Sequence, residues 1–119
     1  MRIDRFEDID AWKESRVLVR DIYGIIGNIR DYGFRDQIQR ASISIMSNIA
    51  EGFDRGTNKE LIYFLTIARG SVAEVRSLLY AAQDIGYVEQ KDGDCLQQRC
   101  LAISKLINGF IRYLKTSPR

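Results

Sequence analysis

Proline is missing from the whole interior of this chain, and that absence constrains the fold more than any other feature of the sequence. The only proline of the 119 residues is Pro118, although proline makes up about 5% of an average protein. Inside a helix, proline removes a backbone hydrogen bond and clashes with the preceding turn. Every earlier position is therefore compatible with an α-helix. We expect breaks at the clustered glycines instead, namely Gly33, Gly52, Gly56, Gly86 and Gly93.

Apolar residues recur at intervals of three and four, which is the spacing of one face of an α-helix. The third such segment has a clear start and end, because Thr57 and Glu60 have the spacing of a capping box and Gly86 can end a helix in a left-handed conformation. Asp8 or Asp10 is expected to cap the first segment. The pattern predicts helices over residues of about 8–30, 35–51, 58–85 and 94–115.

Four amphipathic helices with short connections favour antiparallel neighbours. The sequence therefore predicts an all-α fold, an antiparallel up-down-up-down four-helix bundle that forms one domain over residues 1–119.

The chain has no histidine, so the commonest general base and metal ligand are missing. Glu51 and Glu74 are predicted on adjacent helices, but a di-iron bundle also needs histidine ligands. We expect these carboxylates to pair with Arg40, Arg55 or Arg69, between helices or between subunits. The sequence predicts a non-enzymatic protein with no metal, no cofactor and no small-molecule substrate.

Targeting and redox signals point to the cytoplasm. The longest apolar segment, residues 22–27, is far shorter than the roughly 20 residues that span a bilayer. The N-terminus is charged and lacks the apolar core of a secretory signal. Cys95 and Cys100 lie about 140° apart on one predicted helix and cannot form a disulfide with each other. We expect two free thiols in a reducing cytoplasm and no membrane partner.

The apolar faces of the first two predicted helices are wider than one bundle requires. On a helical wheel each covers roughly 200°, whereas a surface helix buries a stripe of a little over about 100°. Another copy of the chain would bury the surplus. The sequence therefore predicts a homo-oligomer, with much of the interface supplied by these two helices.

A line of polar residues runs along one side of the second predicted helix, and a shorter line follows on the third. In the middle of the third helix, Gly70 costs about 1 kcal/mol relative to alanine. We expect Gly70 to allow close approach of another helix backbone, with Ser71 hydrogen-bonding across that contact. We call the whole set the polar stripe: Gln37, Arg40, Ser44, Asn48, Glu51, Arg55, Gly70, Ser71 and Glu74.

Positive charge is concentrated near the C-terminus. Residues 92–119 hold five basic and two acidic side chains, and no acid follows Arg99. Four of these cations fall within about 80° on a helical wheel, and they predict a basic surface that contacts RNA or DNA phosphates with strong salt dependence. The other interpretation is a solvated face whose cations complement a helix C-terminus. The four cations are Lys105, Arg112, Lys115 and Arg119.

The sequence also resembles a known family along nearly its whole length. The matching residues are Trp12, Tyr32-Gly33-Phe34, Gln37, Arg40-Ala41, Ser44-Ile45, Asn48-Ile49-Ala50-Glu51-Gly52, Arg55, Phe64-Leu65, Ala68, Gly70-Ser71, Glu74 and Gly86-Tyr87. On these residues the chain is similar to the small proteins encoded in intervening sequences of bacterial 23S rRNA genes, a group often named as a ribosomal-protein family.

The resemblance implies an antiparallel four-helix bundle that assembles as a ring, typically a homopentamer, with no enzymatic activity. A related accessory protein of diversity-generating retroelements shares this architecture and binds nucleic acid. We therefore expect a homo-oligomeric bundle associated with RNA or DNA. The alternative is a protein-binding scaffold with no nucleic-acid role, which an exposed groove lined by residues such as Tyr63 or Tyr80 would favour.

Overall fold

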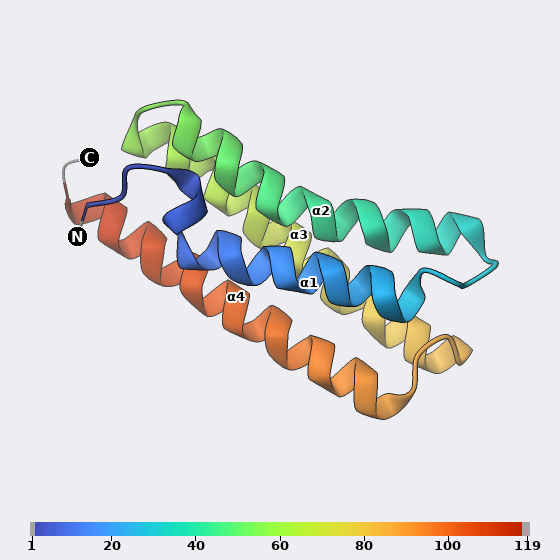
Figure 1. Ribbon diagram of the computed structural model, residues 1–119. Helices are drawn as coiled ribbons and strands as arrows, with labels where there is room; N and C mark the ends of the chain where they lie inside the picture. Colours follow the sequence, from blue (N-terminus) through green and yellow to red (C-terminus); the bar gives the residue numbers. More distant parts are fainter. Residues whose placement is uncertain (1, 118–119) are drawn as a thin grey trace.

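The computed structural model describes residues 2–117, which form a bundle of four long helices about 47 Å long and 22 by 19 Å across. Consecutive helices run in opposite directions and are joined by short loops at alternate ends (Figure 1). Each helix packs on its neighbours in sequence, and α1 packs on α4 to close the bundle. The predicted all-α bundle is confirmed. Its elements are η1 (Phe6–Asp8, a 3-10 turn), α1 (Asp10–Ile26), α2 (Tyr32–Asp54), α3 (Asn58–Ile85) and α4 (Gln90–Thr116).

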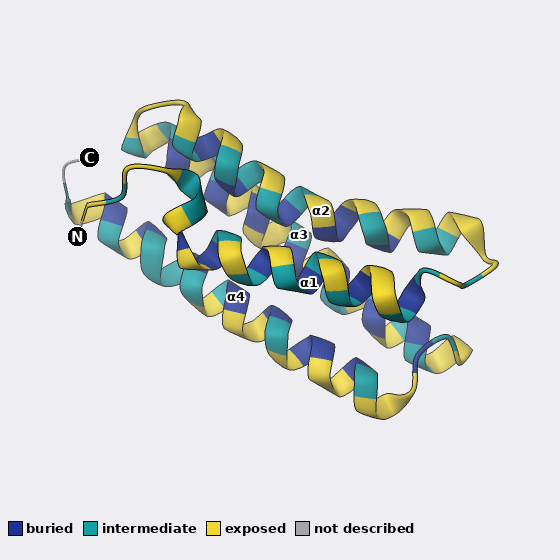
Figure 2. Ribbon diagram, in the orientation of Figure 1, coloured by how far each residue is buried: buried dark blue, intermediate teal, exposed yellow. Residues whose placement is uncertain are grey.

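One hydrophobic core runs along the axis of the bundle, and buried positions face inward on every helix (Figure 2). Burying a large aliphatic side chain contributes about 1.5–3 kcal/mol relative to leaving it exposed. This term holds the four amphipathic faces together. The largest fully buried side chains are Leu18, Ile22, Ile26, Ile38, Ile45, Ile49, Leu61, Leu65, Leu79, Leu96, Ile103 and Ile107.

The bounds of α3 coincide with those predicted. Thr57 caps the helix, since its hydroxyl accepts the backbone N–H of Glu60 at 3.2 Å. Gly86 ends the helix with φ of 91°, a left-handed conformation that favours glycine. Local signals alone therefore determine where α3 begins and ends.

The first helix is shorter than the predicted residues 8–30. It ends at Ile26, and the chain leaves it at Gly27. Ile29 keeps the apolar spacing but packs on the core from the loop, with its N–H bonded to the carbonyl of Ile26 at 3.1 Å. The spacing continued past the end of the helix because the loop still faces the core.

The predicted caps of the first helix are also wrong. Asp8 ends the turn η1, and Asp10 is the first residue of α1. The N-cap is Ile9, which has extended backbone and makes no capping side-chain bond. The ring of Phe6 packs edge-on to Trp12, with 5.2 Å between centroids. That contact folds the chain back into a separate turn before α1 begins.

The second helix is longer at both ends than the predicted residues 35–51. Asp31, which directly follows the predicted end of the first helix, caps the second, because its carboxylate accepts the N–H of Phe34 at 3.2 Å. At the other end, Gly52 lies inside α2 rather than at a break. The turn falls at Gly56, whose φ is 97°.

The fourth helix begins at Gln90, earlier than the predicted residue 94, and ends at Thr116. Gly93 is not a break, since it is buried in the first turn of α4 against Gln83. At the far end, the side-chain amide of Asn58 donates to the carbonyl of Ser117 at 2.6 Å and to that of Leu114 at 3.2 Å. The start of α3 therefore satisfies carbonyls that the end of α4 leaves unpaired.

A hydrogen-bonded cluster ties the α1–α2 loop to the α3–α4 loop. The hydroxyl of Tyr87 donates to the carboxylate of Asp31 at 2.8 Å, and the Tyr87 ring packs edge-on to Phe34. The hydrogen bond from Tyr87, followed by that from the Phe34 N–H, holds the pKa of Asp31 below its usual range. The same bond raises the pKa of Tyr87.

Replacing Tyr87 with phenylalanine is expected to raise the pKa of Asp31 toward its ordinary value. A depressed pKa in the folded state stabilises the fold above the unfolded-state pKa of about 3.9, and this contribution is lost as pH falls through the folded-state pKa. The variant should therefore lose stability at neutral pH and show a shallower decline in acid. A carboxyl NMR titration measures the pKa of Asp31, and urea unfolding at neutral and at acid pH measures the stability. Tyr80→Phe is the control, and an unchanged Asp31 pKa in Tyr87→Phe contradicts this assignment.

Candidate functional site

The structure brings the polar stripe together along the outer seam between α2 and α3. Ser44 and Ser71 share a hydrogen bond across the seam, with 2.9 Å between their hydroxyl oxygens. The Asn48 amide donates to the Ser44 hydroxyl at 3.0 Å, and the Gln37 amide donates to the Glu74 carboxylate at 3.5 Å. Ser71 thus bonds across a helix–helix contact, although not across the close approach predicted at Gly70. The seam therefore joins the two helices through side chains that the sequence places 27 and 37 residues apart.

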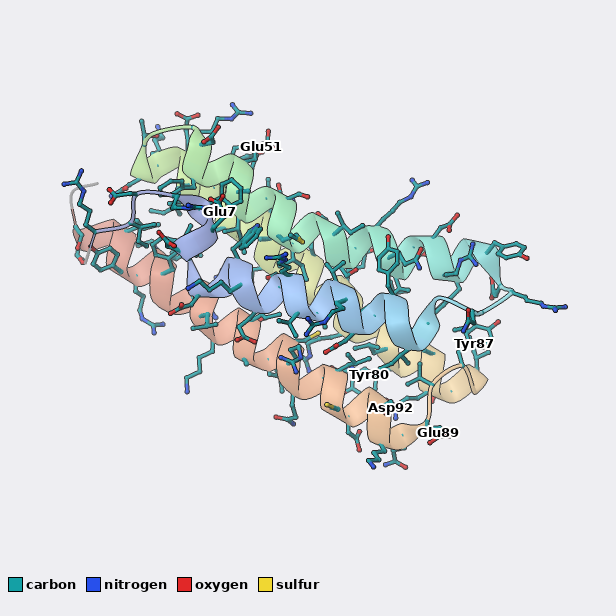
Figure 3. All side chains as sticks on the ribbon, in the orientation of Figure 1. Glu7, Glu51, Tyr80, Tyr87, Glu89 and Asp92 are labelled. Atoms are coloured by element: carbon teal, nitrogen blue, oxygen red, sulfur yellow. The ribbon has the colours of Figure 1, made fainter. Side chains whose placement is uncertain are left out.

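Arg55 organises the end of the seam where α2 turns into α3. Its guanidinium lies 3.1 Å from the Glu51 carboxylate and 3.8 Å from that of Glu60, and it sits 5.0 Å from the centre of the Phe64 ring. Figure 3 shows Glu51 at this end of the bundle. Glu51 therefore pairs with one of the predicted arginines, but the pair lies at the last turn of α2 rather than between helices or subunits. Because both side chains are about half exposed, the pair orders the surface more than it stabilises the fold.

Glu74, Arg69 and Arg40 do not form the ion pairs predicted for them within residues 2–117. Glu74 accepts its hydrogen bond from Gln37 rather than from an arginine. Arg69 points to the other side of α3, where it donates to the side-chain oxygen of Asn108 on α4 at 2.7 Å. Arg40 is exposed, and no ion pair within residues 2–117 includes it. The seam therefore presents a cation without a partner in the described part of the chain.

Within the chain, Gly52 and Gly70 do not have the roles predicted for them. Gly70 is exposed, and a Cβ added to it would meet nothing within 4 Å. A Cβ added to Gly52 would instead lie 2.5 Å from the Cβ of Phe64 and 3.2 Å from a methyl carbon of Leu61. The close helix–helix approach is therefore at Gly52. At Gly70 the chain offers bare backbone facing away from its own core.

The C-terminal cations are partly balanced by acids from the other end of the chain. Lys105 and Arg112 are exposed on α4 and line one groove together with Asp8, Asp10 and Glu14. Although no acid follows Arg99 in the sequence, acids from the N-terminal part of the chain lie close to these two cations in the fold.

The other two C-terminal cations do not join this groove. Lys115 is exposed on the last turn of α4 and does not line it. Arg119 lies outside the described residues. The predicted basic surface therefore reduces to three placed cations, two of which share a groove with acids.

This groove, of about 760 Å³, lies between α4 and the segment that leads into α1, and sequence reasoning missed it. Its apolar residues are typical of core positions, so their local pattern does not reveal a surface hollow. Only the packing of the two chain ends creates it. Its apolar lining includes Ile3, Ile9, Leu106, Phe110 and Tyr113.

Other groups offer little chemistry. Cys95 is exposed and Cys100 is buried, and both are free thiols as predicted. Burial raises the pKa of Cys100 to about 12, which keeps the thiol protonated. Within residues 2–117, no cluster of three or more histidine, cysteine or acidic side chains is suited to a metal. No helix in that range has the length and apolar content to cross a membrane.

Comparisons with known proteins agree with this four-helix architecture. A family model described as 23S rRNA-intervening sequence protein matches residues 7–109. The fold is similar to a crystal structure of a protein with unknown function from the S23 ribosomal protein family of Bacteroides thetaiotaomicron, with a TM-score of 0.79 and 20% sequence identity. That match covers 86% of this chain and 98% of the other, and at this identity it shows the fold alone. No curated protein matches the chain.

Proposed function

The chain belongs to the 23S rRNA-intervening sequence protein family, and from that premise we propose that it is a non-enzymatic, self-associating bundle that contacts RNA or DNA. Two free thiols favour action in the cytoplasm. The observation that carries the proposal is the composition of the α2–α3 seam, where the polar stripe lies beside uncovered apolar side chains and bare backbone.

The seam has the features of a subunit interface. Tyr63 is 63% exposed and Ile67 is 37% exposed, and both lie on α3. Gly70 leaves room beside them for a close backbone approach. Aromatic and aliphatic anchors with ordered polar groups around them are typical of protein–protein interfaces. We propose that another copy covers this seam, so that α3 joins α2 in the interface in place of the first helix expected from the sequence. We also propose that the assembly is the homopentameric ring that the family resemblance implies.

Nucleic-acid contact is supported by the exposed cations Lys105, Arg112 and Lys115 on α4. Acids share the groove with the first two, so a single subunit presents only a modest field. A ring would repeat the three cations in every subunit, and the attraction to phosphates would grow with their number. Such binding is sequence-blind and weakens as salt rises.

Changing Lys105, Arg112 and Lys115 together to glutamine is expected to weaken binding to single-stranded RNA. Removing three phosphate contacts should lower the slope of log K against log salt by about 2. Fluorescence anisotropy of a labelled RNA over a salt series measures this slope.

A second triple variant controls for net charge, because it loses the same three charges from exposed positions elsewhere: Arg30, Lys59 and Lys91 to glutamine. If the α4 variant binds as the wild type does, these cations are not the contact. If the wild-type protein binds no RNA or DNA, the nucleic-acid role is wrong.

A protein-binding scaffold without a nucleic-acid role is the second candidate. The apolar groove between α4 and the start of α1 favours it, as do Tyr63 and Tyr80, which are 63% and 55% exposed. A pull-down from lysate with and without nuclease separates the two candidates. Partners that survive nuclease treatment favour the scaffold, whereas partners that disappear favour nucleic-acid contact.

A further inference from the structure

Helix α1 presents a row of three exposed cations. Lys13, Arg16 and Arg20 follow one another at intervals of three and four residues, and all three side chains are exposed. On an α-helix they fall within about 60° of one another and span roughly 10 Å along the axis. The row lies opposite the buried residues Leu18 and Ile22, so it faces directly away from the core.

Helical spacing places the acids and the bases of α1 on different sides of the helix, and tertiary packing pairs two of the acids with α4. The helix holds equal numbers of acids and bases, and its sequence therefore looks neutral. Arg99 of α4, however, lies 3.3 Å from both Glu14 and Asp21, which holds these acids on the α4 side. Within residues 2–117 no acidic side chain lies within 4.0 Å of any cation in the row. The outward side of α1 is therefore a basic surface without paired acids.

Two aromatic side chains accompany the row. Tyr23 follows Arg20 by three residues, close to the same side of α1, and is 42% exposed. Trp12 is half-buried and lies 5.8 Å from the guanidinium of Arg16. Proteins that bind single-stranded nucleic acids without sequence preference combine two features. A row of cations contacts the phosphate backbone, and an aromatic ring beside it stacks on a base.

We propose that the α1 row binds the phosphate backbone of a single-stranded nucleic acid and that Tyr23 stacks on a base beside it. This inference rests on the proposed nucleic-acid role and assigns the main contact to α1. Within residues 2–117 neither these α1 cations nor Lys105 and Arg112 form an ion pair. Lys105 and Arg112, however, line a groove together with three acids. Glu14 and Asp21 of α1, by contrast, are paired with Arg99 on the α4 side, away from the row. We therefore expect the α1 row as a whole to attract phosphate more strongly than Lys105 and Arg112.

The test compares three triple variants with the wild type on a labelled poly(U) strand over a salt series. The first changes Lys13, Arg16 and Arg20 to glutamine. The second changes the three α4 cations. The third is the control at Arg30, Lys59 and Lys91. We expect the α1 variant to lower the salt slope by about 2 and to weaken binding more than the α4 variant does, while the control leaves the slope unchanged. Tyr23→Ala should weaken binding at an unchanged salt slope, because stacking involves no counterion release.

Each outcome separates this inference from the one it rests on. Wild-type protein that binds no poly(U) overturns both. If the wild type binds and the α1 variant keeps its full salt slope, the α1 assignment is wrong and the nucleic-acid role stands. If the α1 variant and the control lower the salt slope equally, the effect comes from net charge alone, and the α1 assignment is again wrong.

Folding is checked by circular dichroism and thermal melting. Glutamine is a good helix former, so the exposed changes should leave α1 intact. If the triple variant fails to fold, Lys13→Gln and Arg20→Gln are measured singly. Each is expected to lower the salt slope by about 0.7, and an unchanged slope in both overturns the assignment.

Discussion

Replacing Gly52 with alanine is expected to destabilise the bundle by about 1–3 kcal/mol, the usual cost of overpacking a filled site. The added Cβ would lie 2.5 Å from the Cβ of Phe64, an atom fixed to the α3 backbone rather than the end of a flexible side chain. The helices α2 and α3 must therefore move apart, and the core positions beside the contact lose packing. Urea unfolding followed by circular dichroism measures the loss.

Gly70→Ala is the matched control for this change. It is also a glycine-to-alanine change inside a helix, but nothing within the chain lies within 4 Å of the added Cβ. Alanine has the better helix propensity by about 1 kcal/mol, so this variant should be as stable as the wild type or more so. If the two variants have equal stability, the close approach of α2 and α3 at Gly52 is wrong.

Replacing Ile67 with lysine is expected to convert the proposed oligomer to monomers at micromolar concentration. Ile67 lies on the outer seam beside Tyr63, where it is partly exposed in the single chain. In the proposed assembly another copy covers it, and a buried, unpaired ammonium is strongly unfavourable. In a monomer the lysine reaches solvent at little cost. The fold should therefore survive while the assembly does not.

Sedimentation velocity across micromolar concentrations measures this change. Leu101→Lys is the control, because Leu101 is also exposed but lies on α4, which does not pack on α2. A wild-type monomer over the whole range would show that self-association is wrong. An Ile67→Lys protein of unchanged mass would place the interface elsewhere.

Helix boundaries were predictable where the signal is local. Thr57 and Gly86 determine both ends of α3 through bonds within a few residues of each end. At the end of α1 the apolar spacing ran on to Ile29, because a loop residue can pack on the core as well as a helical one. The start of α2 depended on Asp31, whose short polar side chain suits a helix start as well as a loop.

The candidate site was only partly predictable. Periodicity placed the α2 members of the polar stripe on one side of that helix, and the Ser44–Ser71 hydrogen bond and the Glu51–Arg55 ion pair lie on this side. The partner of Glu74 could not be predicted in this way, because several polar residues lie at similar heights on the neighbouring helix. The groove at Lys105 was invisible in the sequence, since its walls come from opposite ends of the chain.

The sequence by itself determined an all-α chain without interior proline, the faces that form its core, and its lack of histidine. These features depend on residues a few positions apart, which helical geometry places on one face. Only the tertiary structure decided that a side chain at Gly52 would meet α3 while one at Gly70 would meet nothing, and that Arg99 of α4 pairs with Glu14 and Asp21 of α1. Whether a missing side chain leaves space, or a charge finds a partner, depends on residues that are distant in sequence and adjacent in the fold.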